Sequence, residues 1–453
     1  MNKKILLISA NRLHDPYPIY PLGISYLTAY LKKSIPALEI LSFDMNRGSM
    51  DDLKDLILSQ NPDYIGISIR NIDGANSFDQ KSFIPEYEEI ARLVKTNSKA
   101  PLILGGAGFS LYAKILFEKL NADFAVKGEG EKALTELIIC LENGVDYRQI
   151  EGLLYRNGTE IVLNSRKEFS TKLTVNYETE LVDFYWQHSG MLNIQTKRGC
   201  YHKCIYCSYP LIEGRRVRTL DIEEIIDNIE RLAVEKNINY VFFTDSLFNI
   251  DREKTVELAE TIIKRGIKIN WAAYFSPSNL TDEELAVYKR SGLSHIEFGT
   301  ESFCDEQLRN YGKDFDFETV LKTSELALKN NIFYAHFLIL GGYGETDKTL
   351  DISFENSRLL RYTAMFPFVG MRIYPGTLLQ QRAINDGIIS ADDDLLAPRY
   401  YISSNFDAST LKQRAQATGK AWIFPDDLSE SDIQTFRVKR KKKGLIWEYL
   451  RKP

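Results

Sequence analysis

The sequence is poor in cysteine and has no long apolar run, and both features exclude classes of protein. Only 5 of its 453 residues are cysteines, too few for a disulfide framework in so long a chain. No stretch reaches the roughly 18 apolar residues of a membrane helix, and residues 1–10 carry no cleavable signal pattern. The 57 Lys plus Arg against 62 Asp plus Glu give a net charge of −5, which argues against general nucleic-acid binding. We therefore expect a cytoplasmic protein without a transmembrane segment.

Short apolar runs alternate with amphipathic stretches over residues 1–145. Such a series is typical of an α/β fold in which helices cover both faces of a parallel sheet. We predict a Rossmann-like, doubly wound sheet whose ligand crevice lies beyond the carboxyl ends of the strands. The predicted strands are Lys4–Ser9, Leu38–Phe43, Tyr64–Ser68, Leu102–Leu104 and Phe124–Val126.

A second alternating series covers residues 188–375, after a weakly patterned segment. Residues 146–187 are predicted to be a linker with a small hairpin. The second series has fewer βα units than a closed eightfold barrel, so we predict a partial (β/α)6 TIM-like barrel with its working face at the carboxyl ends of the strands. Residues 376–453 are predicted to form a small C-terminal region that caps the barrel. The predicted barrel strands are Leu192–Gln195, Tyr240–Thr244, Asn270–Tyr274, His295–Gly299, Phe333–Leu340 and Phe368–Ile373.

Three of the five cysteines lie close together, directly after the first predicted barrel strand. Cys200, Cys204 and Cys207 form a CxxxCxxC motif. These spacings let one short loop hold an iron–sulfur cubane, and the missing fourth cysteine leaves one iron open to another ligand. A zinc site with His202 is the competing metal, but structural zinc usually takes ligand pairs from separated segments. Three unliganded thiols are a further alternative, which the basic neighbours disfavour because they stabilise thiolates. These neighbours are Lys197, Arg198, His202 and Lys203.

The motif, with Tyr206 before its last cysteine and a six-unit barrel around it, closely resembles the radical S-adenosylmethionine (SAM) superfamily. The resemblance implies a [4Fe–4S] cluster on the three cysteines, whose open iron is chelated by the amino and carboxylate groups of SAM. An electron delivered to that cluster cleaves SAM to methionine and a 5′-deoxyadenosyl radical. The resemblance therefore implies an external one-electron donor, such as flavodoxin or ferredoxin.

The same resemblance assigns SAM contacts to the ends of the barrel strands. They comprise a segment after the second strand for the amino group, one after the fourth strand for the ribose and carboxylate, and a glycine turn after the fifth strand for the adenine. The segment after the second barrel strand lacks the glycines that are frequent there in the family. As an alternative, Glu297 or Glu301 only forms a salt bridge with Arg309 or Lys313. The implied SAM-binding residues are Tyr206, Asp245, Ser246, Glu301, Ser302, Gly341 and Gly342.

A Rossmann-like sheet before such a barrel resembles the cobalamin-binding domain of cobalamin-dependent radical SAM enzymes. The DxHxxG loop that supplies an axial histidine in many cobalamin proteins is missing, and His14 is the only histidine of this domain. The resemblance therefore implies cobalamin without a protein histidine on cobalt. A sheet that keeps the fold but has lost the cofactor is the alternative. The implied cobalamin-binding residues are Ser68, Gly105, Gly106, Gly128 and Glu129.

Together these resemblances imply a C-methyltransferase that acts on an unactivated carbon of a small-molecule or lipid-like substrate. One SAM would methylate cobalamin, and a second would yield the radical that activates the substrate. Two alternatives stay open: a related enzyme that performs ring formation, rearrangement or oxidation, and a cobalamin or redox sensor without turnover. A methylthiotransferase is rejected, because it needs three more amino-terminal cysteines and only Cys140 precedes Cys200.

Four remaining features carry weaker predictions. Cys140 is expected in the core of an amphipathic helix, whereas Cys304 lies on the working side of the barrel, where an active-site thiol is an alternative to a core residue. Arg372 is expected near the substrate face, together with Tyr374 and Pro375. The basic run at residues 437–443 is expected to be a solvated face or tail, with phosphate or lipid binding as the alternative.

Overall fold

The computed structural model describes residues 3–14, 16–78, 80–167, 169–170, 173–427, 443–445 and 447. The chain divides into two compact units. Unit 1 comprises Met1–Gly74, Lys81–Tyr185 and Leu211–Glu213, and unit 2 comprises Ala75–Gln80, Trp186–Pro210 and Gly214–Pro453. Residues 437–442 of the basic run lie outside the described residues. No helix of the described chain is long and apolar enough to cross a membrane.

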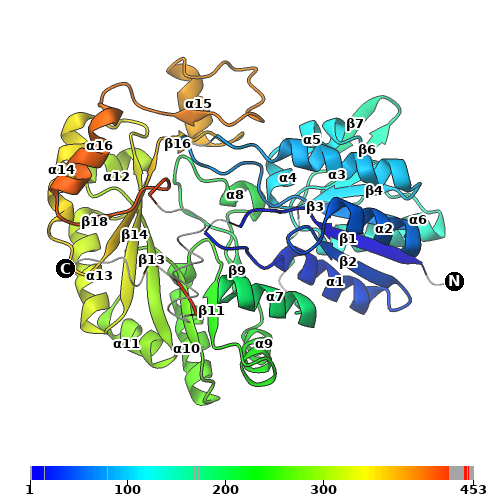
Figure 1. The fold of residues 1–453 in the computed structure, drawn as a ribbon, viewed down its shortest axis with the longest axis horizontal. Helices are drawn as coiled ribbons and strands as arrows, with labels where there is room; N and C mark the ends of the chain where they lie inside the picture. Colours follow the sequence, from blue (N-terminus) through cyan, green and yellow to red (C-terminus); the bar gives the residue numbers. More distant parts are fainter. Residues whose placement is uncertain are drawn as a thin grey trace. The chain divides into compact units, whose positions relative to one another are not determined.

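Unit 1 contains a seven-stranded sheet of order β2-β1-β3-β4-β5-β6-β7 (Figure 1). The first five strands are parallel, which confirms the predicted doubly wound sheet. In the order 2-1-3-4-5 the strand sequence reverses direction between β1 and β3, and ligands of such sheets bind outside this point. The strands are β1 (Lys4–Ser9), β2 (Glu39–Asp44), β3 (Tyr64–Ser68), β4 (Leu102–Gly105), β5 (Phe124–Val126), β6 (Leu153–Asn157) and β7 (Glu160–Leu163).

The helices of unit 1 cover both faces of this sheet. Helix α1 packs beside α6, and α2 packs beside α3. Between the sheet and the first pair lies an apolar core that includes Ile5, Leu7 and Leu137. Helix α2 begins in a capping box in which Ser49 and Asp52 bond each other's backbone N–H. The helices are α1 (Leu22–Ser34), α2 (Met50–Gln60), α3 (Ile84–Asn97), α4 (Ala107–Leu111), α5 (Ala113–Lys119) and α6 (Glu131–Asn143), and α7 (Thr179–Ser189) passes from unit 1 into unit 2 after Tyr185.

The hairpin predicted within residues 146–187 is present as β6 and β7. It does not stand apart as a linker, because β6 pairs antiparallel with β5 and so extends the first sheet by two strands. Pairing with β5 satisfies the backbone groups of that edge strand, which would otherwise be open to another chain.

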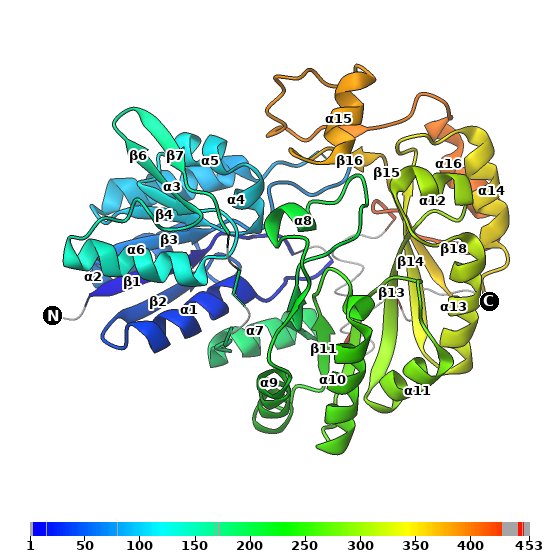
Figure 2. The same ribbon diagram turned by 180° about the vertical axis from the view of Figure 1, so that it is seen from behind.

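Unit 2 contains a second seven-stranded sheet, all parallel, of order β18-β15-β14-β13-β12-β11-β8. Helices such as α10, α11 and α13 follow its outer side (Figure 2). In the described residues β8 and β18 do not pair with each other, so the barrel is partial, as predicted. The strands are β8 (Leu192–Ile194), β11 (Tyr240–Phe243), β12 (Asn270–Phe275), β13 (Leu293–Glu301), β14 (Phe333–Leu340), β15 (Ala364–Val369) and β18 (Ala421–Trp422).

The helices of unit 2 mostly connect successive barrel strands. Their amino ends are capped by Asp or Thr side chains at Asp221, Asp251, Thr281, Asp316 and Thr346. The helices are α9 (Ile222–Glu235), α10 (Arg252–Lys264), α11 (Asp282–Arg290), α12 (Asp305–Tyr311), α13 (Phe317–Lys329), α14 (Asp347–Ser357), α15 (Leu378–Asn385) and α16 (Leu411–Ala417), with short 3₁₀ turns at Phe248–Ile250 and Ala408–Thr410. The short helix α8 (Tyr209–Ile212) has residues in both units.

The sixth barrel strand was placed too late in the sequence. It covers residues 364–369 instead of 368–373, because Gly370 adopts φ +75° and ends it. The next residues, β16 (Met371–Arg372), turn away and pair antiparallel with β17 (Tyr400–Tyr401). A small ribbon of β9 (Lys197–Arg198) and β10 (Arg218–Thr219) lies at the start of the cysteine loop.

The C-terminal region packs on the barrel edge. Strand β18 adds to β15, and Leu411, Ala415 and Phe424 join a core with Leu350 and Phe354 of α14. Residues 443–445 and 447 also belong to unit 2: the Gly444 N–H donates to Gly190 O at 2.8 Å, and Leu445 is buried.

Candidate functional site

The cysteine loop follows β8 at the carboxyl end of the barrel sheet. Cys200 is buried, Cys204 and Cys207 are half-buried, and all three are free thiols. Burial raises the pKa of Cys200, and raises that of Cys207 to about 12 with further increases from the other two cysteines. Burial therefore outweighs the basic neighbours, contrary to our expectation. Three adjacent thiolates need a compensating cation, which an iron–sulfur cluster supplies, and so the residues present fit such a cluster.

The start of the loop is anchored by a buried ion pair. Lys197 and Asp245 are 1% and 0% exposed, and Lys197 Nζ lies 2.8 Å from Asp245 Oδ2. The Asp245 carboxylate also accepts the backbone N–H groups of Thr196 and Lys197 and the Thr196 hydroxyl. Lys197 Nζ makes further bonds to Thr196 Oγ1 and to Phe248 O. Lys197 therefore holds the loop and does not face the thiols.

Gly199 is required by the path of this loop. Its φ is +91°, and a Cβ there would lie 2.1 Å from Arg216 O. Later in the loop the backbone is fixed by bonds from Cys200 N–H to Gly214 O and from Ile205 N–H to Tyr311 O. His202 lies between the cysteines, but its Nδ1 is 3.5 Å from Asp314 Oδ2. In the described residues no group of three or more His, Cys, Asp or Glu side chains is arranged to hold a single metal ion.

Tyr206, Glu301 and Lys313 form a buried group beside the loop. The Tyr206 hydroxyl donates to Glu301 Oε1 at 2.7 Å, and Lys313 Nζ lies 3.3 Å from the same oxygen. Glu301 occupies a register shift in β13 with φ +68°, a conformation that costs energy outside glycine. The salt bridge considered as an alternative is thus present at Glu301. Oε2 makes no hydrogen bond within the described chain, so one oxygen of this carboxylate remains available to a ligand.

Other predicted SAM contacts are engaged within the barrel. The Asp245 carboxylate is fully occupied, which leaves only its backbone for SAM. The Ser246 hydroxyl donates to Gly199 O at 3.4 Å. Ser302 is 1% exposed, pairs with Ser353 and accepts from the Cys304 N–H. The side chains of Asp245, Ser246 and Ser302 thus support the fold of the site, which a strand-end position in the sequence could not distinguish from ligand contact.

The glycine turn after β14 is also shaped by protein neighbours. A Cβ at Gly341 would lie 2.2 Å from the Phe406 ring, and a Cβ at Gly342 would lie 2.5 Å from the Tyr311 hydroxyl. Both glycines are therefore needed for internal packing, whether or not adenine lies against the turn. The turn ends at Glu345, whose pKa burial raises to about 7.

In unit 1, the residues predicted to bind cobalamin divide into two sets. Glu129 and Gly128 form hydrogen bonds within unit 1. The Ser170 N–H donates to Glu129 Oε2, and the Gly128 N–H donates to Ser110 Oγ. Gly106 has φ +107°, and its Cβ would collide with Ile69 O at 2.4 Å. Ser68 and Gly105 stay open to a ligand: the Ser68 hydroxyl makes no hydrogen bond within the described chain, and a Cβ at Gly105 would meet only Val126 O at 3.8 Å.

Sequence analysis missed Asn11 as an individual residue. It follows β1 at the reversal point of the sheet and is 4% exposed, yet neither atom of its amide has a partner within the described chain. The prediction placed the ligand crevice beyond the carboxyl ends of the strands, where Asn11 lies, without naming this residue. Lys313 was considered only as a salt-bridge partner, because no local pattern links it to the cysteine loop more than 100 residues earlier.

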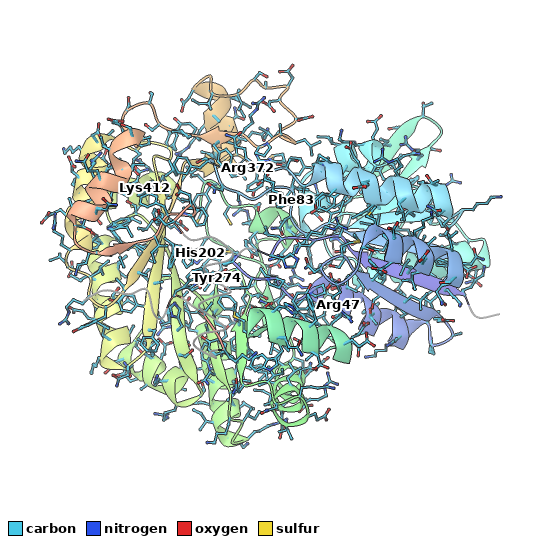
Figure 3. All side chains as sticks on the ribbon, in the orientation of Figure 1. Arg47, Phe83, His202, Tyr274, Arg372 and Lys412 are labelled. Atoms are coloured by element: carbon cyan, nitrogen blue, oxygen red, sulfur yellow. The ribbon has the colours of Figure 1, made fainter. Side chains whose placement is uncertain are left out.

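The weaker predictions are placed as follows. Cys140 is half-buried and packs at the edge of the unit 1 core. Cys304 is 2% exposed, and burial raises its pKa, so it resembles a core thiol. Arg372, labelled in Figure 3, donates to the carbonyls of Ile373 and Leu395 and lies over the Tyr374 ring, which makes it a structural residue of the C-terminal region. His14 is half-buried.

Two family models match the chain in succession. The B12 binding domain matches residues 8–138, and the radical SAM superfamily matches residues 194–355. An uncharacterized methyltransferase of Pyrococcus horikoshii is 23% identical over 95% of this chain and 94% of its own length. Tryptophan 2-C-methyltransferase of Streptomyces laurentii is 23% identical over 82% of this chain and 73% of its own length.

Solved structures share the fold. The radical SAM methyltransferase TsrM of Kitasatospora setae, with cobalamin and a [4Fe-4S] cluster bound, superposes with a TM-score of 0.89 at 21% identity, over 99% of this chain and 97% of that one. The cobalamin-dependent radical SAM enzyme OxsB superposes with a TM-score of 0.73 at 17% identity, over 92% and 66%. The two family models together cover well over half of the sequence, and the chain belongs to the cobalamin-dependent radical SAM enzymes.

Proposed function

We propose that this protein is a cobalamin-dependent radical SAM methyltransferase that transfers a methyl group to carbon in a small-molecule substrate. The observation that carries the proposal is the pairing of a three-cysteine loop, at the carboxyl end of a partial barrel, with a B12 binding domain in one chain. The two curated relatives described above are both named methyltransferases. When bound, the iron–sulfur cluster and cobalamin supply one-electron chemistry and methyl transfer.

The chain's own residues position these groups. The Lys197–Asp245 pair and Gly199 fix the loop that presents the three thiols. Glu301 Oε2, held in place by Tyr206 and Lys313, can accept hydrogen bonds from a SAM hydroxyl or ammonium group. Ser68 and Asn11, at the reversal point of the first sheet, can bond the amide groups at the edge of a corrin. The substrate would bind at the inner face of the barrel sheet, because the working face of such barrels lies at the carboxyl ends of the strands, where the cysteine loop begins.

The alternative function is a reaction that uses the same cofactors but does not methylate the substrate. Relatives also include an anaerobic magnesium-protoporphyrin IX monomethyl ester cyclase of Rubrivivax gelatinosus, 24% identical over 75% of this chain and 62% of its own length. Another is 4′-phospho-dehydrooxetanocin synthase of Priestia megaterium, 25% identical over 66% of this chain and 43% of its own length. Ring formation, rearrangement or oxidation is therefore the alternative, and the mass of the product separates it from methylation.

The test is anaerobic reconstitution with iron, sulfide and cobalamin, followed by turnover with a chemical reductant and SAM carrying a deuterated methyl group. We expect S-adenosylhomocysteine and 5′-deoxyadenosine, and a product heavier by one labelled methyl group. Cys200→Ala, Cys204→Ala and Cys207→Ala should each abolish 5′-deoxyadenosine and the labelled product, because both need the cluster, whereas the matched control Cys140→Ala should retain them. A reconstituted protein that binds both cofactors but forms neither SAM product would be a sensor, and the proposal would be wrong.

The proposal includes a cytoplasmic setting and a one-electron donor such as flavodoxin or ferredoxin. Reducing compartments keep thiols free for metal, and the cluster chemistry needs electrons from outside the chain. Replacing a chemical reductant by reduced flavodoxin in the same assay tests the donor.

A further inference from the structure

The inner face of the barrel sheet is identified by strand register. In parallel strands, residues in register point to the same face, and alternate residues share it. Tyr274 is in register with Glu297, and Phe337 is in register with Phe366. The opposite face contacts helices, as shown by the bond between His336 and Ser324 of α13. Tyr274, Glu297, Phe337 and Phe366 therefore lie on the concave face turned away from the helices.

This inner face is aromatic and partly open. The rings of Tyr274 and Phe337 lie 6.5 Å apart, and those of Phe337 and Phe366 stack at 5.2 Å. Tyr274 is 38% exposed although β12 is flanked by strands on both sides, whereas its chain neighbour Phe275 is 0% exposed on the helix side. Solvent thus reaches Tyr274, labelled in Figure 3, from the inner face.

Glu297 is an acidic group whose described partners in the strand register are uncharged, and Trp447 of the C-terminal region contacts it. The Trp447 indole N–H donates to Glu297 Oε1 at 3.1 Å, and the Trp447 ring lies 4.7 Å from that of Phe366. Glu297 is 2% exposed. Its second oxygen makes no hydrogen bond within the described chain, and this oxygen is not completely enclosed by protein. One oxygen is therefore fixed by Trp447, and the other remains for a ligand.

The carboxyl group is suited to donate a hydrogen bond. Burial raises its pKa to about 8, and the Trp447 bond lowers it in part. At neutral pH the group is mainly protonated, and a neutral acid with one oxygen accepting from Trp447 has an O–H to offer on the other side. The described side chains that surround it on the inner face are uncharged: Tyr274, Phe337, Phe366 and Trp447.

We propose that Glu297, fixed by Trp447, is the hydrogen-bonding anchor of the substrate site, and that the substrate presents there a flat, uncharged group with a hydrogen-bond acceptor. The flat group would lie against Tyr274 and Phe337. Gly299 lies two residues along the strand, about 7 Å away, and its carbonyl accepts from Lys313 beside the cysteine loop. A bicyclic group can cover that distance. The proposal rests on the proposed function only in taking the inner face as the place where substrate binds.

The test uses the full-length protein with its cluster reconstituted and its tryptophans replaced by 5-fluorotryptophan. The resonance of Trp447 is assigned with Trp447→Phe, and the protein is titrated with three bicyclic probes: coumarin, which carries a carbonyl acceptor, naphthalene, which has none, and 2-naphthoate, which is charged. We expect the Trp447 resonance to shift on binding, and coumarin to bind at least about tenfold more tightly than either other probe.

Variants separate the anchor from simple packing. Glu297→Leu should abolish the preference for coumarin and leave naphthalene binding unchanged, whereas Glu297→Gln, whose amide can accept from Trp447 and donate to coumarin, should keep the preference. Equal affinities in the wild-type protein, or a preference that survives Glu297→Leu, would overturn the proposal. If Glu297→Leu does not fold, loss of the preference in Trp447→Phe supports the proposal, and its full retention contradicts it. Because binding alone is read, absence of SAM turnover would reject the proposed function without touching this result.

Discussion

Replacing Asp245 by Asn should loosen the start of the cysteine loop. The substitution keeps the shape of the side chain but removes its charge and turns one acceptor oxygen into a donor. Lys197, 1% exposed, would then be a buried ammonium without a counter-charge. Loss of one partner of a buried ion pair costs about 3–5 kcal/mol, which is a large part of the roughly 5–15 kcal/mol that stabilises a typical domain.

Hydrogen exchange gives the most direct measurement, because two backbone N–H groups donate to Asp245. We expect the amides of Thr196 and Lys197 to exchange at least about a hundredfold faster in Asp245→Asn, since a loss of about 3 kcal/mol corresponds to roughly two powers of ten. Iron content after reconstitution should fall in parallel.

Two controls isolate the ion pair. Lys197→Met with Asp245→Leu removes both charges and should recover most of the stability, because an apolar pair of similar volume has no unpaired charge. Lys254→Gln breaks the exposed pair with Glu257 and should change stability by less than about 0.5 kcal/mol. Unchanged exchange at Thr196 and Lys197, together with full iron loading in Asp245→Asn, would refute the anchoring role.

Three further predictions follow from single positions. Gly199→Ala should prevent cluster loading because its Cβ would meet Arg216 O, whereas Gly266→Ala, at φ +67° with nothing within 4 Å of the new Cβ, should load normally; equal iron contents would contradict this. Cobalamin should bind without a protein histidine on cobalt, so electron paramagnetic resonance of the cobalt(II) state should be the same in His14→Ala, and nitrogen splitting that disappears in the variant would refute it. Glu297 has a folded pKa of about 8 against 4.5 in the unfolded chain, so its contribution to stability is complete below about pH 4.5 and is lost as pH rises to about 8. Glu297→Gln should therefore gain stability relative to the wild-type protein over this window, by at most about 1.4 kcal/mol per pH unit in urea unfolding; a constant difference would contradict the raised pKa.

The strands could be predicted from the sequence because buried parallel strands are short apolar runs. The predicted strand Tyr64–Ser68 matches β3, and Phe333–Leu340 matches β14. The sixth barrel strand was misplaced because the apolar run continues from Ala364 to Ile373, and only the conformation of Gly370 shows where it divides. Strand β18 has two residues, too few for any periodicity, and its pairing with β15 depends on tertiary contacts alone.

The side-chain network of the site was less predictable. The spacing of the three cysteines predicts the metal chemistry from one short stretch of sequence. Tyr206, Glu301 and Lys313 are separated by up to 107 positions, and only the folding of the barrel brings them into contact. Strand-end polar residues such as Asp245 and Ser302 gave the same sequence signal as ligand contacts. Their burial and full hydrogen bonding distinguish them, and neither property can be read from residue type.

A glycine in the sequence likewise does not show whether it serves the fold or a ligand. Two glycines at the cysteine loop serve the fold. At Gly199 and Gly312 the positive φ serves the chain, because a Cβ would collide with Arg216 O or Lys203 O. The cysteine loop is further held by the bond from Ile205 N–H to Tyr311 O and that from Leu379 N–H to Ile205 O. Packing and hydrogen bonds within the chain thus shape the backbone around the thiols, and supporting contacts of this kind hold ligating side chains in a fixed geometry.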